Sequence, residues 1–342
     1  MKSTFGDRVG QRTIIVFVFL VLLCAFLFFA EIFSGSVKVS VRDLFEILFL
    51  KNENSVKKNI FFLIRLPRTL MAFLLGGALS VSGFLLQTYF QNPIAGPFVL
   101  GISSGSRFCV SLCLLLFFKM GLAISSVSLV LASFVGAILV SFIMLLFSKK
   151  ISGSASLLVA GLMSSYIFSG LSEGVSAFAD DSHIATMHRW ASGSFSGMKM
   201  EDFYFSFPLI LFSLIFTFLL SKRFSAYRLG ESYARTLGVP IKIFRTEVLL
   251  LSSILSSCVT AFAGPISFVG VAVPFLTKRA FASTYPKILI PGTFLGGSAF
   301  CLFCDIISRT IFAPTELPLG VVTSLCGSPI VLFMLVEKRN GK

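Results

Sequence analysis

The chain has 342 residues, of which 56% are hydrophobic and only 13% are charged. Soluble domains have about 25% charged residues, so this composition, with a mean hydropathy of +0.93, excludes an ordinary soluble protein and indicates a multi-spanning membrane protein. The net charge of +14 does not indicate a nucleic-acid partner. The basic residues lie in short loops between apolar runs, where the positive-inside rule places them.

The apolar runs predict an all-α membrane protein that forms a single transmembrane domain over residues 1–342. A transmembrane helix needs roughly 20 apolar residues, and the chain has room for about ten. The run that follows the basic N-terminus is too long for a signal peptide, so we interpret it as an uncleaved first span. The expected spans are residues 14–33, 69–90, 97–118, 122–148, 155–178, 203–221, 246–264, 267–277, 288–307 and 319–336.

The charges between these spans predict that both termini are cytoplasmic. Lys149 and Lys150 mark an inside end, and residues 222–247 carry six basic residues against two acidic ones. Residues 173–202 carry five acidic residues against two basic ones, which marks an outside loop. Residues 34–68 carry seven basic residues against three acidic ones, or four if Glu31 just before them is included, and contradict this bias because they would lie outside. We expect this segment to form a short helix or hairpin on the surface.

A central stretch, residues 65–105, combines charge with unusually small side chains. Arg65 and Arg68 flank a Leu-Pro pair, and an apolar run with small residues from Gly76 to Gly83 follows. Small residues let helix backbones approach closely in a bilayer. The stretch therefore predicts a tightly packed central helix with a charged collar at one end, although an ordinary span with basic flanks is an alternative.

The Walker A pattern of nucleotide-binding loops and the HExxH motif of zinc proteases are both absent from the sequence. The seven cysteines lie in or beside apolar runs, and the pair Cys301 and Cys304 lacks the two further ligands of a structural zinc site. We therefore expect inert, buried thiols.

Ionisable residues inside the expected spans are also scarce. An ion-coupled carrier places such residues within its membrane helices, and the candidates here are Glu173 and Asp305, near the ends of their spans. Asp305 precedes Arg309 by four residues, so a local helical ion pair accounts for it. This scarcity indicates that the energy source for transport is on another polypeptide.

The inside segment 222–247 contains a short helix-forming run, Ser232–Leu237, that Gly238 and Pro240 end. Ala234 and Leu237 would lie on one face of this helix, which suits docking into a groove on a cytosolic partner. The alternative is a solvated connector.

Several motifs occur in one order along nearly the whole chain, and together they resemble the FecCD family. This family comprises the permease subunits of ABC importers for iron chelates and vitamin B12. The motifs are RLPRTL at 65–70, NPIAGPFVLGISSG at 92–105, GESYARTLGV at 230–239, GPISFVGVAVP at 264–274, GTFLGGSAFCLFCDIISR at 292–309 and ELPLGVVTSLCGSPI at 316–330. The chain departs from the family at Pro274-Phe275, where Pro-His is common.

The resemblance implies the architecture of a type II ABC importer permease in the bacterial inner membrane. It implies a homodimer that assembles with two cytoplasmic ATPase subunits and a periplasmic or lipid-anchored substrate-binding protein. ATP and Mg would be bound by the ATPase, so we expect this chain to bind no cofactor and not to be an enzyme. A partner on the outside would also explain how the basic segment 34–68 can lie there.

The resemblance also implies residue roles. Arg65, Arg68 and Arg309 would face the periplasm and dock on glutamates of the binding protein. The coupling loop would contact the ATPase through Gly230, Glu231, Ala234, Leu237 and Gly238. Gly153 and Ser154 match the position of the cytoplasmic gate.

The substrate does not follow from these motifs. A ferric chelate, either a siderophore or haem, is the favoured prediction, and cobalamin is the alternative. A stand-alone secondary transporter and a membrane-embedded enzyme are alternatives from other classes. They would need the intramembrane carboxylates or the catalytic motif that the sequence scarcely offers.

Overall fold

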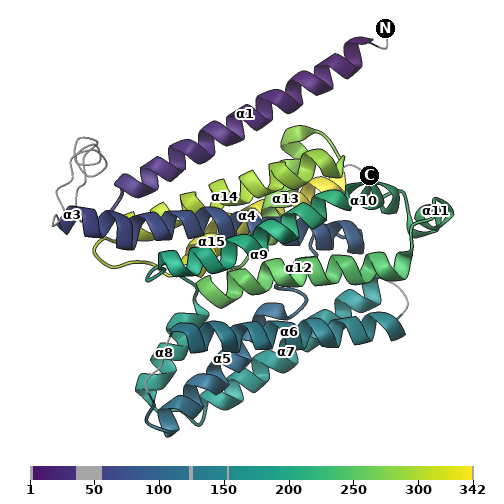
Figure 1. The fold of residues 1–342 in the computed structure, drawn as a ribbon. Helices are drawn as coiled ribbons and strands as arrows, with labels where there is room; N and C mark the ends of the chain where they lie inside the picture. The colour runs from purple at the N-terminus through teal and green to yellow at the C-terminus, as the bar shows by residue number, and fades with distance from the viewer. Residues whose placement is uncertain (1–2, 36–55, 123–125, 152–153, 341–342) are drawn as a thin grey trace.

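The computed structural model describes residues 3–35, 56–122, 126–151 and 154–340. Within these ranges every regular element is a helix (Figure 1). The helices are α1 (Ser3–Phe33), α3 (Val56–Asn59), the π-helix η1 (Ile60–Arg65), α4 (Leu66–Phe90), α5 (Ile102–Lys119), α6 (Ser126–Lys150), α7 (Ser154–Ser176), α8 (Asp181–Ala191), α9 (Met200–Leu219), α10 (Ser221–Tyr227), α11 (Glu231–Thr236), α12 (Ile241–Ala263), α13 (Val269–Phe281), α14 (Pro286–Thr310) and α15 (Leu319–Asn340).

The number of membrane helices agrees with the sequence prediction. In the described part of the chain, 9 helical segments are long and apolar enough to cross a bilayer. The remaining expected span is α13, which has only 13 residues and is too short to cross by itself. The all-α membrane architecture is therefore confirmed.

Helix α4 is the centre of the bundle. It packs against α14, α12 and α13 (Figure 1), and 89% of its most apolar window lies inside the protein. Small residues make this possible. A Cβ atom added at Gly83 would lie 1.7 Å from the carbonyl oxygen of Gly270, and one added at Gly76 would lie 2.6 Å from that of Gly297. The prediction of a tightly packed central helix is confirmed.

The helix that contains α4 begins earlier than expected. Residues 56–90 form one helical segment, of which η1 is a π-helical turn. Pro67 explains this turn, because a proline inside a helix lacks an N–H group and clashes with the carbonyl four residues before it. The N–H group of Leu66 accordingly donates to the carbonyl of Phe61. Residues 56–68 of the segment 34–68 thus belong to the central helix, and the surface helix or hairpin expected from the first part of this segment falls on residues 36–55, which lie outside the described part.

Two other expected loops contain helices. The acidic segment 173–202 includes α8, and the basic segment 222–247 includes α10, α11 and the first turns of α12. A short helix near α11 was expected from the sequence, whereas α8 and α10 were not, because their polar sequences contain no long apolar run.

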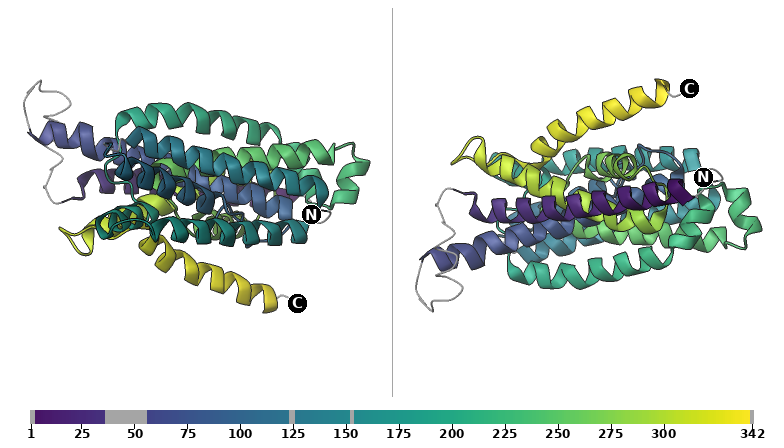
Figure 2. Two further views of the ribbon diagram at one scale, coloured as in Figure 1. Left: turned by 90° about the horizontal axis from the view of Figure 1, so that it is seen from below. Right: turned by 90° about the horizontal axis from the view of Figure 1, so that it is seen from above.

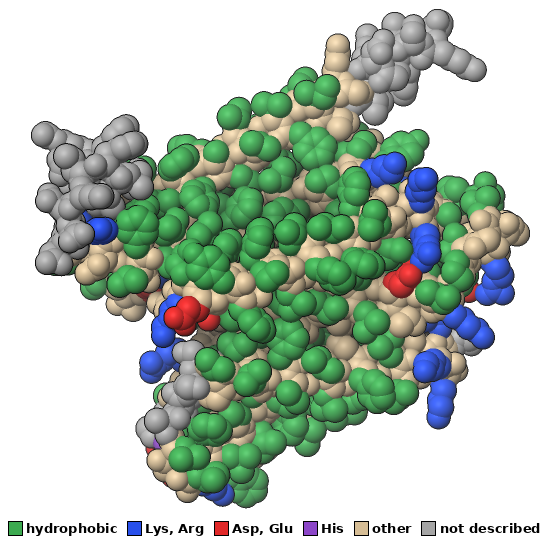
Figure 3. Space-filling view, viewed as in Figure 1, with side chains coloured by type: hydrophobic (Ala, Val, Ile, Leu, Met, Phe, Trp, Pro, Cys, Tyr) green, Lys and Arg blue, Asp and Glu red, His purple; other side chains and the backbone are tan. Residues whose placement is uncertain are grey.

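The two ends of the bundle differ in the chain segments and charged side chains that lie there. Both chain termini and α11 lie at one end, and α3 lies at the other (Figures 1 and 2). Lys and Arg side chains gather around the α11 end (Figure 3). This arrangement agrees with cytoplasmic termini, and we call this end the inner end and the opposite one the outer end.

Candidate functional site

A cluster of buried charges lies at the outer end, and Arg68 is its centre. Its Nε and Nη2 atoms donate to both carboxylate oxygens of Asp305 on α14, at 2.8 and 2.9 Å. Its Nη1 atom donates to Glu316 in the loop after α14, at 2.9 and 3.0 Å. Bidentate guanidinium–carboxylate pairs of this kind combine charge with a fixed geometry, so Arg68 joins α4 to α14 and to the outer loop.

Arg65 and Arg309 extend the cluster to α1. The Nη1 atom of Arg65 donates to the carbonyl of Ile32 at 2.6 Å, and the Nη2 atom of Arg309 donates to the carbonyl of Glu31 at 2.8 Å. Both acceptors belong to the last turn of α1, where carbonyls lack partners within the helix. The two arginines therefore cap α1 and hold it against the bundle.

The structure brings the three predicted docking arginines together but buries them. Arg65, Arg68 and Arg309 are 3%, 4% and 9% exposed. Glu31, Asp305 and Glu316 compensate their charge, and among these acids the Glu316 side chain is 40% exposed. Burial beside the chain's own carboxylates differs from the open face expected from the sequence, while the docking role itself stays a prediction.

The expected local pair of Asp305 with Arg309 is only part of the arrangement. The Nε atom of Arg309 lies 3.4 Å from Asp305, farther than the two donors of Arg68. Sequence reasoning missed Glu31 and Glu316. The unexplained basic charge of segment 34–68 was the sequence signal that could have indicated these two glutamates. Arginines at membrane depth require carboxylate partners.

At the inner end, α11 is a short helix held between two glycines. Gly230 precedes it with φ +118° and Gly238 follows it with φ +80°, values that glycine adopts at little cost. Glu231 and Arg235 form an ion pair at 3.0 Å across one turn. The expected helix is confirmed in place and length.

The face that α11 presents differs from the predicted one. Ala234 is buried in the chain, whereas Leu237 is 58% exposed. Leu237 lies after the last helical residue, where the chain turns. The side chain of Tyr233 is also exposed, by 49%. Tyr233 lies on the same face as Leu237, because residues four apart in a helix share a face. A cytosolic groove would therefore meet Tyr233 and Leu237, not Ala234.

Aromatic contacts connect the coupling segment to the central helix. Tyr227 at the end of α10 stacks on Tyr89 of α4, with ring centroids 5.7 Å apart, and Arg245 of α12 lies 6.0 Å from the Tyr89 ring. Burial raises the pKa of Tyr227, so its hydroxyl group stays neutral. These contacts form a packed connection from α10 to α4 and α12.

The predicted gate residues are placed only in part. Gly153 lies outside the described residues, and Ser154 is the first residue of α7. Their role stays a prediction.

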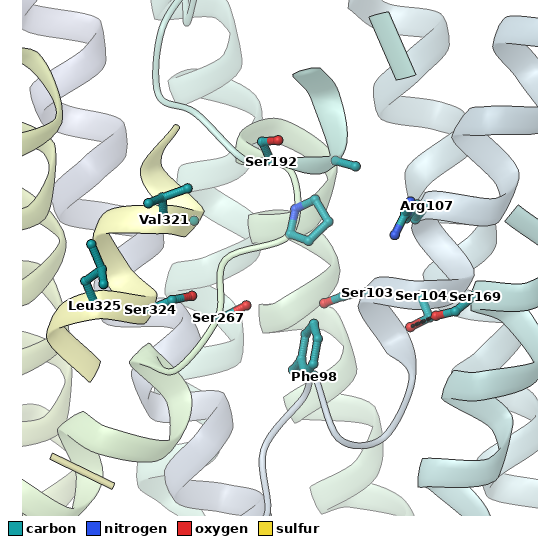
Figure 4. Close-up of a pocket in the computed structure, with 13 residues that line it drawn as sticks. Phe98, Ser103, Ser104, Arg107, Ser169, Ser192, Ser267, Val321, Ser324 and Leu325 are labelled. Carbon is teal, nitrogen blue, oxygen red and sulfur yellow. Dashed lines mark hydrogen bonds between the residues drawn. The ribbon is translucent and has the colours of Figure 1, made fainter. Parts of the chain in front are cut away.

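A cavity of about 490 Å³ opens in the half of the molecule that contains α5 and α15 (Figure 4). Its walls come from α5, α7, α15 and the segments that follow α8 and α12. Serine hydroxyl groups dominate its polar surface. The lining residues are Phe98, Ser103, Ser104, Arg107, Ser169, Ala191, Ser192, Pro265, Ser267, Gly320, Val321, Ser324 and Leu325.

Metal-ligand clusters are absent from the described part of the chain, where no three His, Cys, Asp or Glu residues group together. Cys301 and Cys304 are fully buried in α14. His183 stacks on Phe118 with ring centroids 3.5 Å apart.

Comparison with known proteins decides the family. The sequence profile of the FecCD transport family matches residues 22–337. The chain belongs to the FecCD family.

Two curated FecCD relatives and one solved structure show the extent of the similarity. The hemin transport system permease HmuU of Yersinia pestis is 33% identical over 339 residues, which cover 98% of this chain and 99% of the relative. The vitamin B12 import permease BtuC of Klebsiella pneumoniae is 32% identical and covers 81% of this chain and 82% of its own. A metal-chelate-type ABC transporter in an inward-facing conformation superposes with a TM-score of 0.83 at 29% identity, covering 95% of this chain and 99% of its own.

Proposed function

We propose that this chain is the permease subunit of a binding-protein-dependent ABC importer for a ferric chelate, in the bacterial inner membrane. Two copies would form the translocation pathway, with two cytoplasmic ATPase subunits below and a binding protein above. The observation that carries the proposal is the similarity to a hemin permease over 98% of the chain. The position of α11, at the end that holds both termini, supports the site of ATPase contact.

The described spans support an external energy source. None of them carries Asp or Glu in its central third, and Glu31 and Asp305 near the outer end both lie beside arginines. A proton- or sodium-driven carrier needs carboxylates within the membrane. A stand-alone secondary transporter is therefore the weaker alternative.

We infer a division of roles between this chain and its partner ATPase. ATP and Mg would be bound by the partner ATPase, whose movement would shift α11. The stacked rings of Tyr227 and Tyr89 would pass this movement to the central helix, and the gate near Ser154 would open as α7 shifts. This chain would contribute a pathway and mechanical coupling and would itself perform no catalysis.

A ferric chelate is favoured over cobalamin because the hemin permease matches nearly the whole chain, whereas the vitamin B12 permease matches 81% of it. The two identities are similar, so cobalamin is kept as the second candidate.

The proposal is tested by the ATPase activity of the reconstituted complex. The chain is assembled with its ATPase in lipid vesicles, and hydrolysis is measured with and without substrate-loaded binding protein. We expect the loaded protein to stimulate hydrolysis several-fold. An ATPase that does not associate with this chain, or one that does not respond to the loaded protein, would contradict the proposal.

A further inference from the structure

The cavity contains one charged residue among its lining side chains. Arg107 lies on α5, about one turn from Ser103 and Ser104, and faces the cavity from the wall opposite Val321 and Leu325 (Figure 4). No carboxylate lines the cavity. Its polar wall therefore has a net positive charge, while its opposite wall is largely apolar.

Arg107 differs from the arginines at the outer end because it has no partner among the residues that the structure describes. The guanidinium group makes no hydrogen bond and no ion pair with any residue in the described ranges. It is partly buried and belongs to a membrane-spanning helix. Ionisable residues within spans are costly and normally pair with another group, so an unpaired one that faces a cavity indicates a ligand of opposite charge.

The serines around Arg107 are already engaged with one another. Ser104 lies 2.8 Å from Ser165 and 3.3 Å from Ser169, and Ser103 lies 3.4 Å from Thr260. These hydroxyl groups provide a neutral polar surface that fixes the wall of α5 against α7 and α12. They do not neutralise Arg107, which is left as the one strong donor that the cavity offers to a ligand.

We propose that Arg107 selects anionic substrates by binding a carboxylate group of the chelate in this cavity, an inference that rests on the proposed function. The carboxylate edge would lie against Arg107, and the apolar body would lie against Val321 and Leu325. A single partly hydrated arginine suits a pathway, because a ligand in transit must bind strongly enough to enter and weakly enough to leave. A chelate without carboxylates would gain nothing from Arg107.

The chain's single tryptophan gives a direct binding assay. Trp190 immediately precedes Ala191, which lines the cavity, so a coloured ferric ligand in the cavity will quench its fluorescence. The purified chain in lipid nanodiscs is titrated with haem, which carries two carboxylates, and with haem dimethyl ester, which carries none. We expect haem to bind the unaltered chain about tenfold more tightly than its diester, the size of one charge-assisted hydrogen bond.

Variants separate charge recognition from structural effects. Arg107→Gln should weaken haem binding about tenfold and leave diester binding unchanged, while Arg107→Lys should lose less. Lys119→Gln is the matched control, since it removes a positive charge from the exposed end of the same helix and should change neither affinity. Unchanged diester binding also shows that a variant is folded.

The proposal is overturned if haem and its diester bind the unaltered chain equally, or if Arg107→Gln weakens both ligands alike. It is also overturned if Lys119→Gln reproduces the effect of Arg107→Gln. This assay needs no ATPase, so a failure of the proposed importer function would appear in the hydrolysis experiment and leave the result for Arg107 unaffected.

Discussion

At the scale of single residues, Arg68 is central to the outer end because its one guanidinium group binds two carboxylates, those of Asp305 and Glu316. Removal of one partner from a buried ion pair leaves an uncompensated charge. We expect Arg68→Gln to lower the free energy of unfolding by about 3 to 5 kcal/mol, measured by thermal or denaturant unfolding in detergent. Arg223→Gln at the inner end is the control, because its partner Glu247 is partly exposed and exposed pairs contribute about 0 to 1 kcal/mol.

A double variant tests whether the loss is electrostatic. Replacement of both Arg68 and Asp305 by leucine removes the pair and leaves no charge unpaired between these two residues, so part of the stability should return. Equal stability of Arg68→Gln and the unaltered chain would contradict the role of the cluster.

Glu316 provides a residue-scale test of docking. It holds Arg68 and is the exposed member of the cluster, so Glu316→Gln would release the Nη1 atom of Arg68 for a glutamate of the binding protein. If the arginines bind this protein, the affinity of the Glu316→Gln chain for the binding protein should be several-fold higher than that of the unaltered chain at low salt. Surface plasmon resonance with the loaded binding protein measures the change, and an unaltered or reduced affinity would contradict docking through Arg68.

At the scale of elements, close contact between α4 and α13 depends on Gly83. A methyl group there would overlap the backbone of Gly270, and overpacking of this kind costs about 1 to 3 kcal/mol or more. We expect Gly83→Ala to lower the unfolding temperature and the yield of folded protein. Gly170→Ala on α7 is the matched control, because nothing lies within 4 Å of the added methyl group. Similar behaviour of the two variants would contradict the packing of α4.

The exposed face of α11 carries the ATPase contact in our proposal. Tyr233→Ala and Leu237→Ala should each weaken ATPase binding by about 1 to 2 kcal/mol, or 5- to 30-fold, as for anchor residues in an interface. Ile311→Ala, an equally exposed apolar residue at the outer end, should have no effect. Co-purification with the ATPase measures binding. A greater loss of binding for Ile311→Ala than for the two α11 variants would contradict an ATPase interface at the inner end.

Most of the helices could be predicted from the sequence, because the length of an apolar run and the spacing of small residues are properties of a short stretch of chain. The spans and the position of α11 follow from these signals. The π-helical start of the α4 segment could not be predicted, since it results from Pro67 within a continuing helix. Ala234 was misplaced because helical spacing alone does not show which face the chain buries.

The candidate site was harder to predict, because its partners are distant in sequence. The three arginines could be singled out, but Asp305 and Glu316 reach Arg68 from positions more than 230 residues away. Such pairing depends on the packing of α4 against α14, which no local pattern encodes. Arg107 gave no motif at all, and only the cavity makes it noticeable.

At the scale of the whole molecule, the central helix α4 connects the outer end to the inner end. The outer end holds a balanced charge cluster, the inner end presents α11, and α4 connects them through contacts with α12, α13 and α14. In the importer that we propose, this chain supplies the pathway and a partner ATPase supplies the energy.

Uptake of a radiolabelled ferric chelate into proteoliposomes tests this central claim most directly. The vesicles contain the chain with or without its ATPase, and the loaded binding protein and ATP are supplied on opposite sides of the membrane. We predict accumulation only when the ATPase, ATP and the binding protein are all present, and none under a proton or sodium gradient alone. Gradient-driven uptake by the chain without the ATPase would contradict the account.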